Sequence, residues 1–513
     1  MAAPNNSNPM QIEPSEAAFA ECYGRNEPQV VWTTLVADLE TPVSAFLKLG
    51  GKAMSFLFES VEDGAVRGRY SIIGLEPDLI WRTKGTVAEV NSAARKNNDT
   101  FVPCPEPPLQ ALRKLIADSR IALPDNLPPM AAGIFGYLGY DMVRLMEELP
   151  PSNPDSIGIP DAILVRPTVI VIFDAVKDSI TVVTPARPER GVDAKTSLAR
   201  AIERLTNVIG KLDQPLDMSL PEYDAGPIDV PTTSNTSPEE FKGMVRKAKE
   251  YIFAGDAFQI VLAQRFEAPF TLPPFSLYRA LRRTNPSPYL YFLDFGSFAV
   301  AGSSPEILVK VADDVVTVRP IAGTSHRGST AQEDKALEKE LLADPKERAE
   351  HLMLLDLGRN DVGRVATIGT VEVTDQFFVE RYSHVMHIVS NVEGRLAQDR
   401  DALDALAAGF PAGTVSGAPK VRAMQIIDEL EKEKRGLYAG CVGYFSAAGE
   451  MDTCIVLRTA LVKDGTMYVQ AGAGVVADSE PDFEQQECIN KAKALFRAAE
   501  EARRFASAAK RTQ

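Results

Sequence analysis

Short apolar runs and helical periodicities are mixed along this chain without the regular alternation of strand and helix that builds a parallel sheet. The apolar runs that predict strands occupy residues 54–58, 70–73, 168–173, 258–266 and 382–392. Apolar residues spaced by three and four predict helices at 237–255, 332–343, 345–357 and from 481 past 496. The mixture favours an α+β fold over a doubly wound α/β sheet.

Proline and glycine punctuation divides the chain into four predicted regions. Residues 1–28 are rich in Asn, Pro and Glu and indicate a loose tail, and residues 29–210 form an N-terminal region of short strands. Residues 211–236 are polar and proline-rich, which is typical of a linker. The last region, 237–513, opens with Ser-Pro-Glu-Glu, a pattern that caps and starts a helix.

The acidic balance of the chain limits its partners. The formal net charge is -15, which argues against nucleic acid and anionic membranes, since both require basic surfaces. The five cysteines are scattered without a Cys-x-x-Cys pair, so neither a disulfide framework nor a zinc site is expected. No apolar run reaches the length of a membrane helix and no signal peptide is evident, so we expect a cytoplasmic protein.

Two predicted helices each carry a Glu-x-x-Glu pair: Glu347 and Glu350 on one, Glu484 and Glu487 on the other. A spacing of three places both carboxylates of a pair on one helix face. Two such faces could together hold Mg²⁺, which accepts one or two carboxylates and keeps water for other oxygens. The alternative is two solvated acidic faces, and spacing alone favours that alternative.

Two further segments are candidates for binding or catalysis. Gly472-Ala473-Gly474 precedes the last helix, where small residues would let a carboxylate approach backbone N–H groups. His387 lies among apolar neighbours, where loss of solvation would keep its imidazole neutral. The stretch from Gly413 to Lys420 is not a phosphate loop, because a proline precedes the lysine and a valine follows it.

Ordered sequence blocks across residues 237–500 resemble the chorismate-utilising enzymes. The blocks are Gly302-Ser-Ser-Pro-Glu306, Pro320-Ile-Ala-Gly-Thr324, Glu350-His-Leu-Met-Leu-Leu-Asp356, Arg359-Asn-Asp361, Tyr382-Ser-His-Val-Met-His387, Phe410-Pro-Ala-Gly-Thr414, Met451-Asp-Thr-Cys-Ile455 and Gln470-Ala-Gly-Ala-Gly474. The resemblance implies the α+β fold of that family, with large, mostly antiparallel sheets packed against helices.

The residues at two positions distinguish the branches of the family. The aminodeoxychorismate synthases carry a lysine nucleophile where this chain has Ala322. Isochorismate and salicylate synthases carry a water-activating lysine where this chain has Gln259. Lacking both lysines, the chain resembles the anthranilate synthases, which convert chorismate and ammonia to anthranilate and pyruvate. The alternatives are an aminodeoxychorismate synthase component and a catalytically silent tryptophan-binding protein.

The resemblance also implies a role for each matching residue. Glu350 and Glu487 would ligate Mg²⁺, with Glu347 and Glu484 supporting through water. Glu306 would be the general acid that protonates the departing 4-hydroxyl, and His387 the base that removes the C2 proton. The residues expected to hold chorismate are Gly323, Thr324, Tyr438, Arg458, Gly472, Ala473, Gly474 and Lys491.

Regulation and partnership are implied in the same way. Tryptophan would bind where two segments meet, and the residues expected there are Glu59, Ser60, Pro288, Tyr289 and Leu290. The region 29–210 would therefore be regulatory. No stretch of the chain resembles a glutamine amidotransferase, so the resemblance implies a separate small amidotransferase subunit that supplies ammonia.

Overall fold

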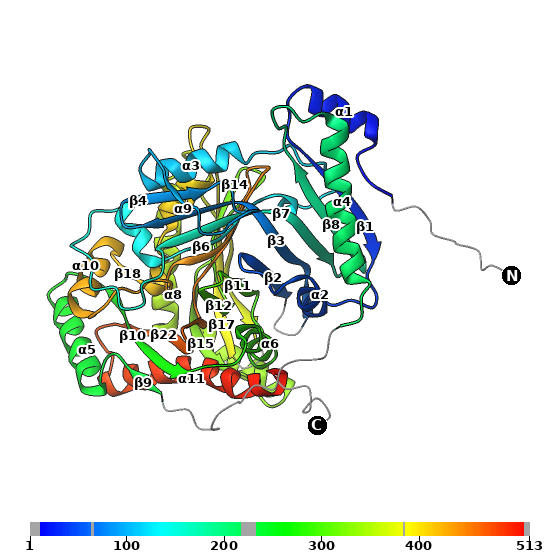
Figure 1. The fold of residues 1–513 in the computed structure, drawn as a ribbon. Helices are drawn as coiled ribbons and strands as arrows, with labels where there is room; N and C mark the ends of the chain where they lie inside the picture. Colours follow the sequence, from blue (N-terminus) through cyan, green and yellow to red (C-terminus); the bar gives the residue numbers. More distant parts are fainter. Residues whose placement is uncertain (1–10, 63–65, 217–231, 383–384, 507–513) are drawn as a thin grey trace.

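A computed structural model describes residues 11–62, 66–216, 232–382 and 385–506 of the chain (Figure 1). The strands are β1 Gln29–Val36, β2 Ser55–Glu62, β3 Val66–Lys84, β4 Val87–Asn91, β5 Val102–Pro103, β6 Gly133–Leu138, β7 Ala162–Asp174, β8 Ser179–Ala186, β9 Thr233–Ser234, β10 Gln259–Pro269, β11 Tyr289–Asp294, β12 Phe298–Ser304, β13 Ile307–Ala312, β14 Val315–Val318, β15 Ile321–His326, β16 Glu372–Arg381, β17 Val385–Arg395, β18 Gly417–Ala418, β19 Cys441–Ser446, β20 Met451–Ile455, β21 Thr459–Lys463 and β22 Thr466–Val475. The helices are α1 Glu16–Gly24, α2 Pro42–Leu49, α3 Pro108–Asp118, α4 Ala194–Leu212, α5 Pro238–Phe253, α6 Pro274–Thr284, α7 Ala331–Ala343, α8 Pro345–Gly363, α9 Ala402–Gly409, α10 Lys420–Leu430 and α11 Pro481–Ala506, with 3₁₀ turns η1 Pro129–Ala131, η2 Tyr140–Leu145 and η3 Gly413–Val415.

The strands of the two halves of the chain are interleaved in one connected antiparallel network. Strand β2 pairs with β3 on one side and with β11 on the other, and β6 pairs with β7 and with β19. The blue and cyan strands of the first half therefore lie beside green and orange strands of the second half (Figure 1). The predicted α+β class is confirmed. The predicted regions 29–210 and 237–513 do not form separate sheets, because long-range strand pairing joins them.

Residues 1–10 of the predicted loose tail lie outside the described residues, and residues 11–28 are folded rather than loose. Helix α1 forms within it because Ser15 caps its first turn and Phe19 is fully buried. Glu13 and Trp32 exchange backbone hydrogen bonds of 2.9 and 2.8 Å, which ties the segment before α1 to β1. Most of the predicted linker, residues 217–231, lies outside the described residues.

The helix predicted after the linker is confirmed as α5. The Ser237 side chain accepts from the Glu240 N–H, and the Glu240 carboxylate accepts from the Ser237 N–H at 2.8 Å. These two bonds satisfy backbone donors that a helix start leaves free. Gly255, at φ +86°, follows the end of the helix as predicted.

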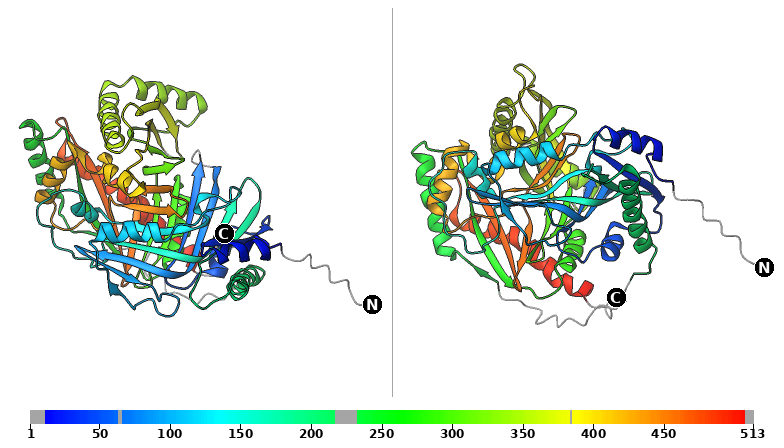
Figure 2. Two further views of the ribbon diagram at one scale, coloured as in Figure 1. Left: turned by 90° about the horizontal axis from the view of Figure 1, so that it is seen from above. Right: turned by 45° about the horizontal axis from the view of Figure 1, so that its top comes forward.

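Apolar faces hold the two helices that carry the paired glutamates. Leu495 and Ala498 of α11 are fully buried and share a core cluster with Leu281 of α6. Leu355 and Val362 of α8 are buried in a second core cluster. Burying a Leu or Val side chain contributes about 1.5–3 kcal/mol, so each helix is fixed by its apolar face while its other side stays available. The yellow-green helices α7 and α8 stand out from the body in Figure 2.

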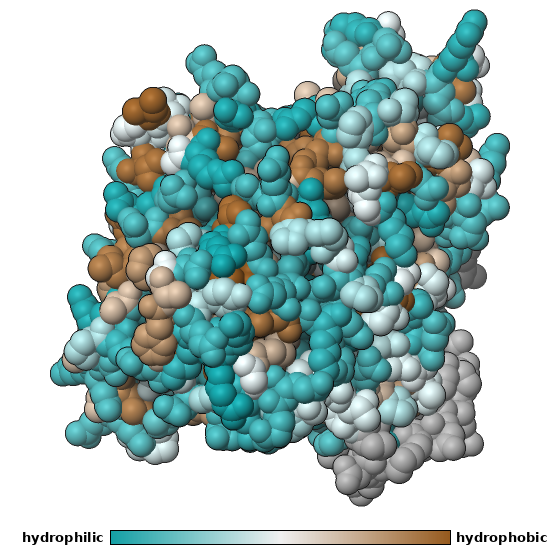
Figure 3. Space-filling view, turned by 90° about the vertical axis from the view of Figure 1, so that its left-hand side faces the viewer, coloured by the Kyte–Doolittle hydropathy of each residue, from teal (hydrophilic) through white to brown (hydrophobic). Residues whose placement is uncertain are grey.

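One face of the molecule is mainly hydrophilic (Figure 3). The face shown in Figure 3 carries small, separated hydrophobic patches on a teal surface. Within the described residues, no helix is long and apolar enough to cross a membrane.

Candidate active site

Glu306 lies in the turn between β12 and β13, with only 6% of its surface exposed. The Thr414 hydroxyl donates a 3.0 Å hydrogen bond to Glu306 Oε1. Burial raises the pKa of Glu306 to about 8, although this hydrogen bond and one from the Ile321 backbone act in the opposite direction. At neutral pH the carboxyl therefore carries a proton, which is the property that the predicted general acid requires.

His387 projects from β17 opposite Thr324 of β15. Its Nδ1 lies 3.0 Å from the Thr324 hydroxyl and 3.2 Å from the Gly323 carbonyl oxygen. A carbonyl oxygen only accepts, so this contact favours the tautomer with the proton on Nδ1 and leaves Nε2 free to accept one. Burial lowers the pKa of His387 to about 4, assisted by the positive charges of Arg458 and Lys491. The imidazole is neutral, as the sequence predicts, and it is also a weak base until those charges are compensated.

Tyr382 connects the predicted acid and the predicted base. Its ring meets the His387 ring edge-on, with centroids 5.4 Å apart. Burial raises the pKa of Tyr382, the neighbouring Glu380 raises it further, and the charge of Glu306 adds a smaller increase. Tyr382 is thus within electrostatic range of Glu306 and in contact with His387, which places both groups around one site.

Gly323 brings α8 against this site. Its φ of +74° is a conformation that favours glycine, and an added Cβ would lie 3.2 Å from Glu347 Oε2. The Glu347 carboxylate therefore reaches the strand that supports His387.

The four predicted metal-site glutamates, two on α8 and two on α11, are linked by electrostatic interactions. Burial raises the pKa of Glu350, and the charges of Glu347 and Glu487 raise it further. Glu484 is 5% exposed, so the alternative of a solvated acidic face is wrong for that residue. The Gln259 side chain donates a 3.2 Å hydrogen bond to Glu350 Oε1 and so holds this carboxylate.

An oxygen-rich site of this kind fits Mg²⁺. Repulsion among the carboxylates is what a cation would relieve, and Mg²⁺ is held through one or two carboxylates plus water. Within the described residues, no group of three or more His, Cys, Asp or Glu side chains is close enough to hold a metal ion by itself. Glu350 and Glu487 as ligands, with Glu347 and Glu484 acting through water, therefore stay a prediction.

The predicted binding segment Gly472–Gly474 lies at the end of strand β22. It is a strand because these residues pair with Val261, Leu262 and Ala263 of β10. Ala473 is fully buried in the core, so only its backbone can face a ligand. An added Cβ would lie 2.8 Å from Tyr438 Oη at Gly472 and 2.7 Å from Gln259 Nε2 at Gly474, so glycine leaves room for both side chains.

Two predicted substrate-binding cations lie near the same strand. Lys491 Nζ donates to the Gly472 carbonyl oxygen at 2.9 Å and pairs with Glu487 at 2.6 Å. Arg458 is half-buried, and burial lowers its pKa. Its guanidinium forms no hydrogen bond or ion pair with any described residue, so it can bind a carboxylate.

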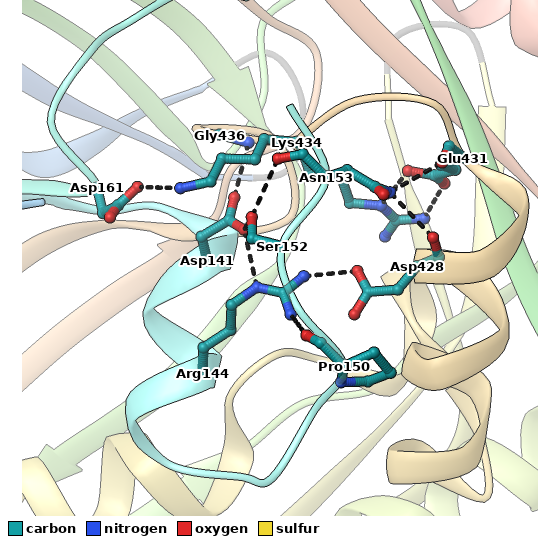
Figure 4. Close-up of polar contacts among 11 residues, drawn as sticks. Asp141, Arg144, Pro150, Ser152, Asn153, Asp161, Asp428, Glu431, Lys434 and Gly436 are labelled. Atoms are coloured by element: carbon teal, nitrogen blue, oxygen red, sulfur yellow. Dashed lines mark hydrogen bonds and ion pairs between the residues drawn. The ribbon is translucent and has the colours of Figure 1, made fainter. Parts of the chain in front are cut away.

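The segment that carries Tyr438 is attached to the first half of the chain by a polar network (Figure 4). Arg144 donates to Asp428 at 2.6 Å, and Lys434 pairs with Asp161 at 3.3 Å. Both contacts join residues from opposite halves of the sequence.

A buried ion pair completes the support of Tyr438. Arg435 Nε donates to Glu431 Oε2 at 2.9 Å, and Glu431 Oε1 accepts from the Ala263 N–H at 2.9 Å. The Arg435 guanidinium lies 5.6 Å from the Tyr438 ring centroid. Strand β10 and Tyr438 are therefore fixed by one charged pair.

The two segments predicted to form the tryptophan site meet as neighbouring strands. Ser60 of β2 pairs with Tyr289 of β11, and Glu59 pairs with Leu290. Neighbouring residues of a strand face opposite sides of the sheet. Glu59 is buried and accepts from Arg282 at 2.7 and 3.0 Å, and Leu290 is buried in the core.

Ser60 therefore lies on the other side of the sheet. Its hydroxyl donates to the Tyr70 carbonyl oxygen at 3.0 Å, and the Tyr289 hydroxyl donates to Asp452 at 3.1 Å. Pro288 directly precedes β11 and is partly exposed. Contact of these residues with tryptophan stays a prediction.

Three contributors to the site were not predicted from the sequence. Thr414 and Tyr382 lie in recognised blocks but had no assigned role, and Gln259 was used only to exclude a lysine. Thr414 and Gln259 act through contacts with distant segments, for which the sequence carries no local signal.

Comparisons with known proteins show the family to which the chain belongs. The family profile described as chorismate binding enzyme matches residues 75–497. Anthranilate synthase component 1 of Cereibacter sphaeroides is 56% identical over 490 residues, covering 95% of this chain and 98% of the relative. The Thermus thermophilus protein of the same name is 48% identical, covering 91% of this chain and 97% of the relative.

Solved structures give the same result. The crystal structure of anthranilate synthase component I from Streptococcus pneumoniae matches with a TM-score of 0.74 and 39% identity, covering 90% of this chain and 98% of that one. The menaquinone-specific isochorismate synthase of Escherichia coli matches with a TM-score of 0.68 at 20% identity, covering 94% of this chain and all of that one. The second match shows a shared fold only.

Proposed function

Because the chain belongs to the family of chorismate-binding enzymes, we propose that it is an anthranilate synthase large subunit. It converts chorismate and ammonia to anthranilate and pyruvate, the first committed step toward tryptophan. The observation that carries this assignment is a protonated carboxyl, Glu306, and a neutral imidazole, His387, around one site.

The first step is amination. Ammonia attacks C2 of chorismate, the ring double bonds shift, and Glu306 gives its proton to the 4-hydroxyl, which leaves as water. The product is 2-amino-4-deoxyisochorismate. The raised pKa of Glu306 supports this role, because the acid must hold a proton at neutral pH and give it up in the transition state.

The second step is elimination. His387 Nε2 takes the proton from C2, the enolpyruvyl group leaves as pyruvate, and the ring becomes aromatic. Arg458 and Lys491 lower the pKa of His387 in the free protein. Binding of a dicarboxylate between them would compensate these charges and make the imidazole more basic when the substrate is present.

The four glutamates would hold Mg²⁺ as described above. When bound, the metal supplies a Lewis acid that orients the ring carboxylate of chorismate. Arg458 suits the second carboxylate, since its planar guanidinium offers paired donors. Thr324, Tyr438 and the backbone of Gly472–Gly474 complete the binding surface.

Two buried positions favour this reaction over those of other family members. Ala322 is 8% exposed and offers no nucleophile where an aminodeoxychorismate synthase would have its lysine. Gln259 is 3% exposed and its amide holds Glu350. A silent tryptophan-binding protein would not need a buried acid and base.

The name component 1 of its relatives implies a partner subunit. We propose that the partner is a glutamine amidotransferase that supplies ammonia, that both act in the cytoplasm, and that tryptophan inhibits the complex through Ser60 and Tyr289. The pairing of β2 with β11 supports this last point, because a ligand there contacts both halves of the chain.

The test is incubation of the purified chain with chorismate, Mg²⁺ and either ammonium or glutamine. Anthranilate should form with ammonium, at rates that rise with free ammonia, and should not form with glutamine. Formation of 4-aminobenzoate, or no consumption of chorismate, would overturn the assignment.

A further inference from the structure

A strongly basic cavity is lined by residues of α4 and of the end of β8, and it shares no residue with the sites assigned above. Figure 1 shows α4 beside β8. Its volume is about 320 Å³. Its charged lining consists of six cations and two carboxylates: Arg95, Lys96, Arg166, Arg187, Arg200 and Arg204, with Asp78 and Glu189. In a chain of net charge -15, such a concentration of arginine needs a physical reason.

Internal ion pairs account for only part of this charge. Arg166 pairs with Asp78 at 2.7 Å, and the exposed Arg200 pairs with Glu189 at 3.3 Å. These pairs use both carboxylates of the lining.

Three arginines therefore lack a carboxylate partner. Arg95, Arg187 and Arg204 form no ion pair with any described residue. The cavity thus keeps a net positive charge after its internal pairs are formed.

Two of these three are held in position by neutral oxygens. Arg187 donates to the backbone carbonyls of Asp118 and Ser119 at 3.3 and 2.9 Å. Arg204 donates to the Thr184 hydroxyl at 2.6 Å and to the Pro185 carbonyl at 3.3 Å. A guanidinium has five N–H donors, so each of these keeps donors for a ligand while its direction is fixed.

The local electrostatics favour an anion in this cavity. Burial lowers the pKa of both Arg187 and Arg204 to about 10, and a neighbouring arginine adds to the effect in each case. Both remain charged at neutral pH. Half-buried cations without a counter-charge are costly, and a bound anion would remove that cost.

A second cavity of about 520 Å³ adjoins the first and shares Arg95, Lys96, Arg200 and Arg204 with it. The rest of its lining includes the apolar and amide side chains of Leu49, Leu75, Pro77, Asn97 and Asn98, together with the ion pair of Lys52 with Glu76 and the carboxylate of Glu203. Together the cavities are in the size range of small-molecule sites. The first cavity is cationic, and the apolar and amide groups of the second can contact an organic group.

We infer that these cavities form a binding site for a phosphorylated small molecule. Its phosphate groups lie among Arg95, Arg187 and Arg204, and its organic part extends toward Asn97 and Asn98. Phosphate is the chemistry that several converging guanidinium groups match best, because each offers paired donors to two oxygens. The site shares no residue with the proposed active site or the proposed tryptophan site.

The experiment is calorimetric titration of the full-length chain with pyrophosphate, ATP, inorganic phosphate and citrate, without Mg²⁺. The variants are Arg95→Gln and Arg204→Gln, with Arg359→Gln as the control, because Arg359 is an exposed arginine paired with Asp356 on α8. Arg95 is exposed and makes no ion pair, so Arg95→Gln tests the proposal even if Arg204→Gln does not fold.

We expect saturable binding of ATP and pyrophosphate to the wild-type chain. Each cavity variant should weaken it at least about tenfold, since hydrogen bonds to charged groups are individually strong. The control should bind normally, and ammonia-dependent anthranilate formation should persist in all three variants. No binding at millimolar pyrophosphate or ATP, equal loss in the control, or citrate binding as tightly as pyrophosphate would overturn the inference.

Discussion

Replacing Thr414 by valine should move the alkaline limit of activity to higher pH. The Thr414 hydroxyl donates to Glu306 and stabilises its ionised form, so it holds the pKa of that carboxyl down toward about 8. Valine has nearly the same shape but no donor, and the pKa should rise. A hydrogen bond to a charged group contributes about 1.5–3 kcal/mol, and one pKa unit corresponds to about 1.4 kcal/mol. The expected shift is therefore about one to two pH units upward.

The sign follows from the role of Glu306 as an acid. Activity requires its protonated form, which is present below the folded pKa and is lost as pH rises through it. The measurement is kcat/KM for chorismate against pH, at a constant concentration of free ammonia, since free ammonia itself rises with pH. Thr414→Ser keeps the hydroxyl and is the matched control. A limit that stays in place or moves to lower pH in Thr414→Val would refute the assignment of Glu306.

Three further predictions concern the other proposed groups. His387→Ala should still consume chorismate and accumulate 2-amino-4-deoxyisochorismate, with anthranilate formation about 10²–10⁴-fold slower, as mass spectrometry of the products would show; near-normal anthranilate release would exclude His387 as the base. Glu350→Gln should abolish activity at ordinary Mg²⁺ concentrations while the circular dichroism spectrum stays unchanged. The control Asp356→Asn, on the exposed face of the same helix, should have normal activity. Equal Mg²⁺ dependence of activity in both variants would favour a non-metal role for Glu350. Tryptophan should raise the KM for chorismate about 5- to 150-fold if the coupling free energy between the two sites is about 1–3 kcal/mol, and Ser60→Arg should remove this increase. A Ser60→Arg variant that tryptophan still inhibits would exclude this site.

Local signals in the sequence were sufficient for individual elements. The capping pattern at Ser237 predicts α5, and the proline at 345 separates α7 from α8 as observed. The sequence did not predict helix α1, because the segment is mostly polar and only Phe19 is fully buried in the core. At Gly472–Gly474 the local signals indicated small residues ahead of the last helix, but not the ladder with strand β10 that holds the segment.

The candidate site is a different case, because the roles of its residues came from resemblance and spacing could not supply them. Glu306 and His387 carry no mark in the sequence that brings them together, and both pKa shifts arise from burial by other segments. Helical spacing paired Glu347 with Glu350, but only the tertiary fold brings Glu487 within electrostatic range of Glu350. Tertiary contacts of this kind are beyond any local pattern.

The interleaving of strands sets the order in which the molecule can be built during synthesis. While the ribosome is still translating the second half, β11 and β19 do not yet exist, so their partners β2 and β6 each have an unpaired strand edge. Open edges of this kind are the surfaces through which nascent chains aggregate. Strand β22, near the end of the chain, pairs with both β10 and β21, so a polypeptide that stops before β22 leaves an edge of each of these strands unpaired. We therefore expect incomplete chains to be prone to aggregation, and a separately expressed first half to be insoluble rather than a working regulatory domain.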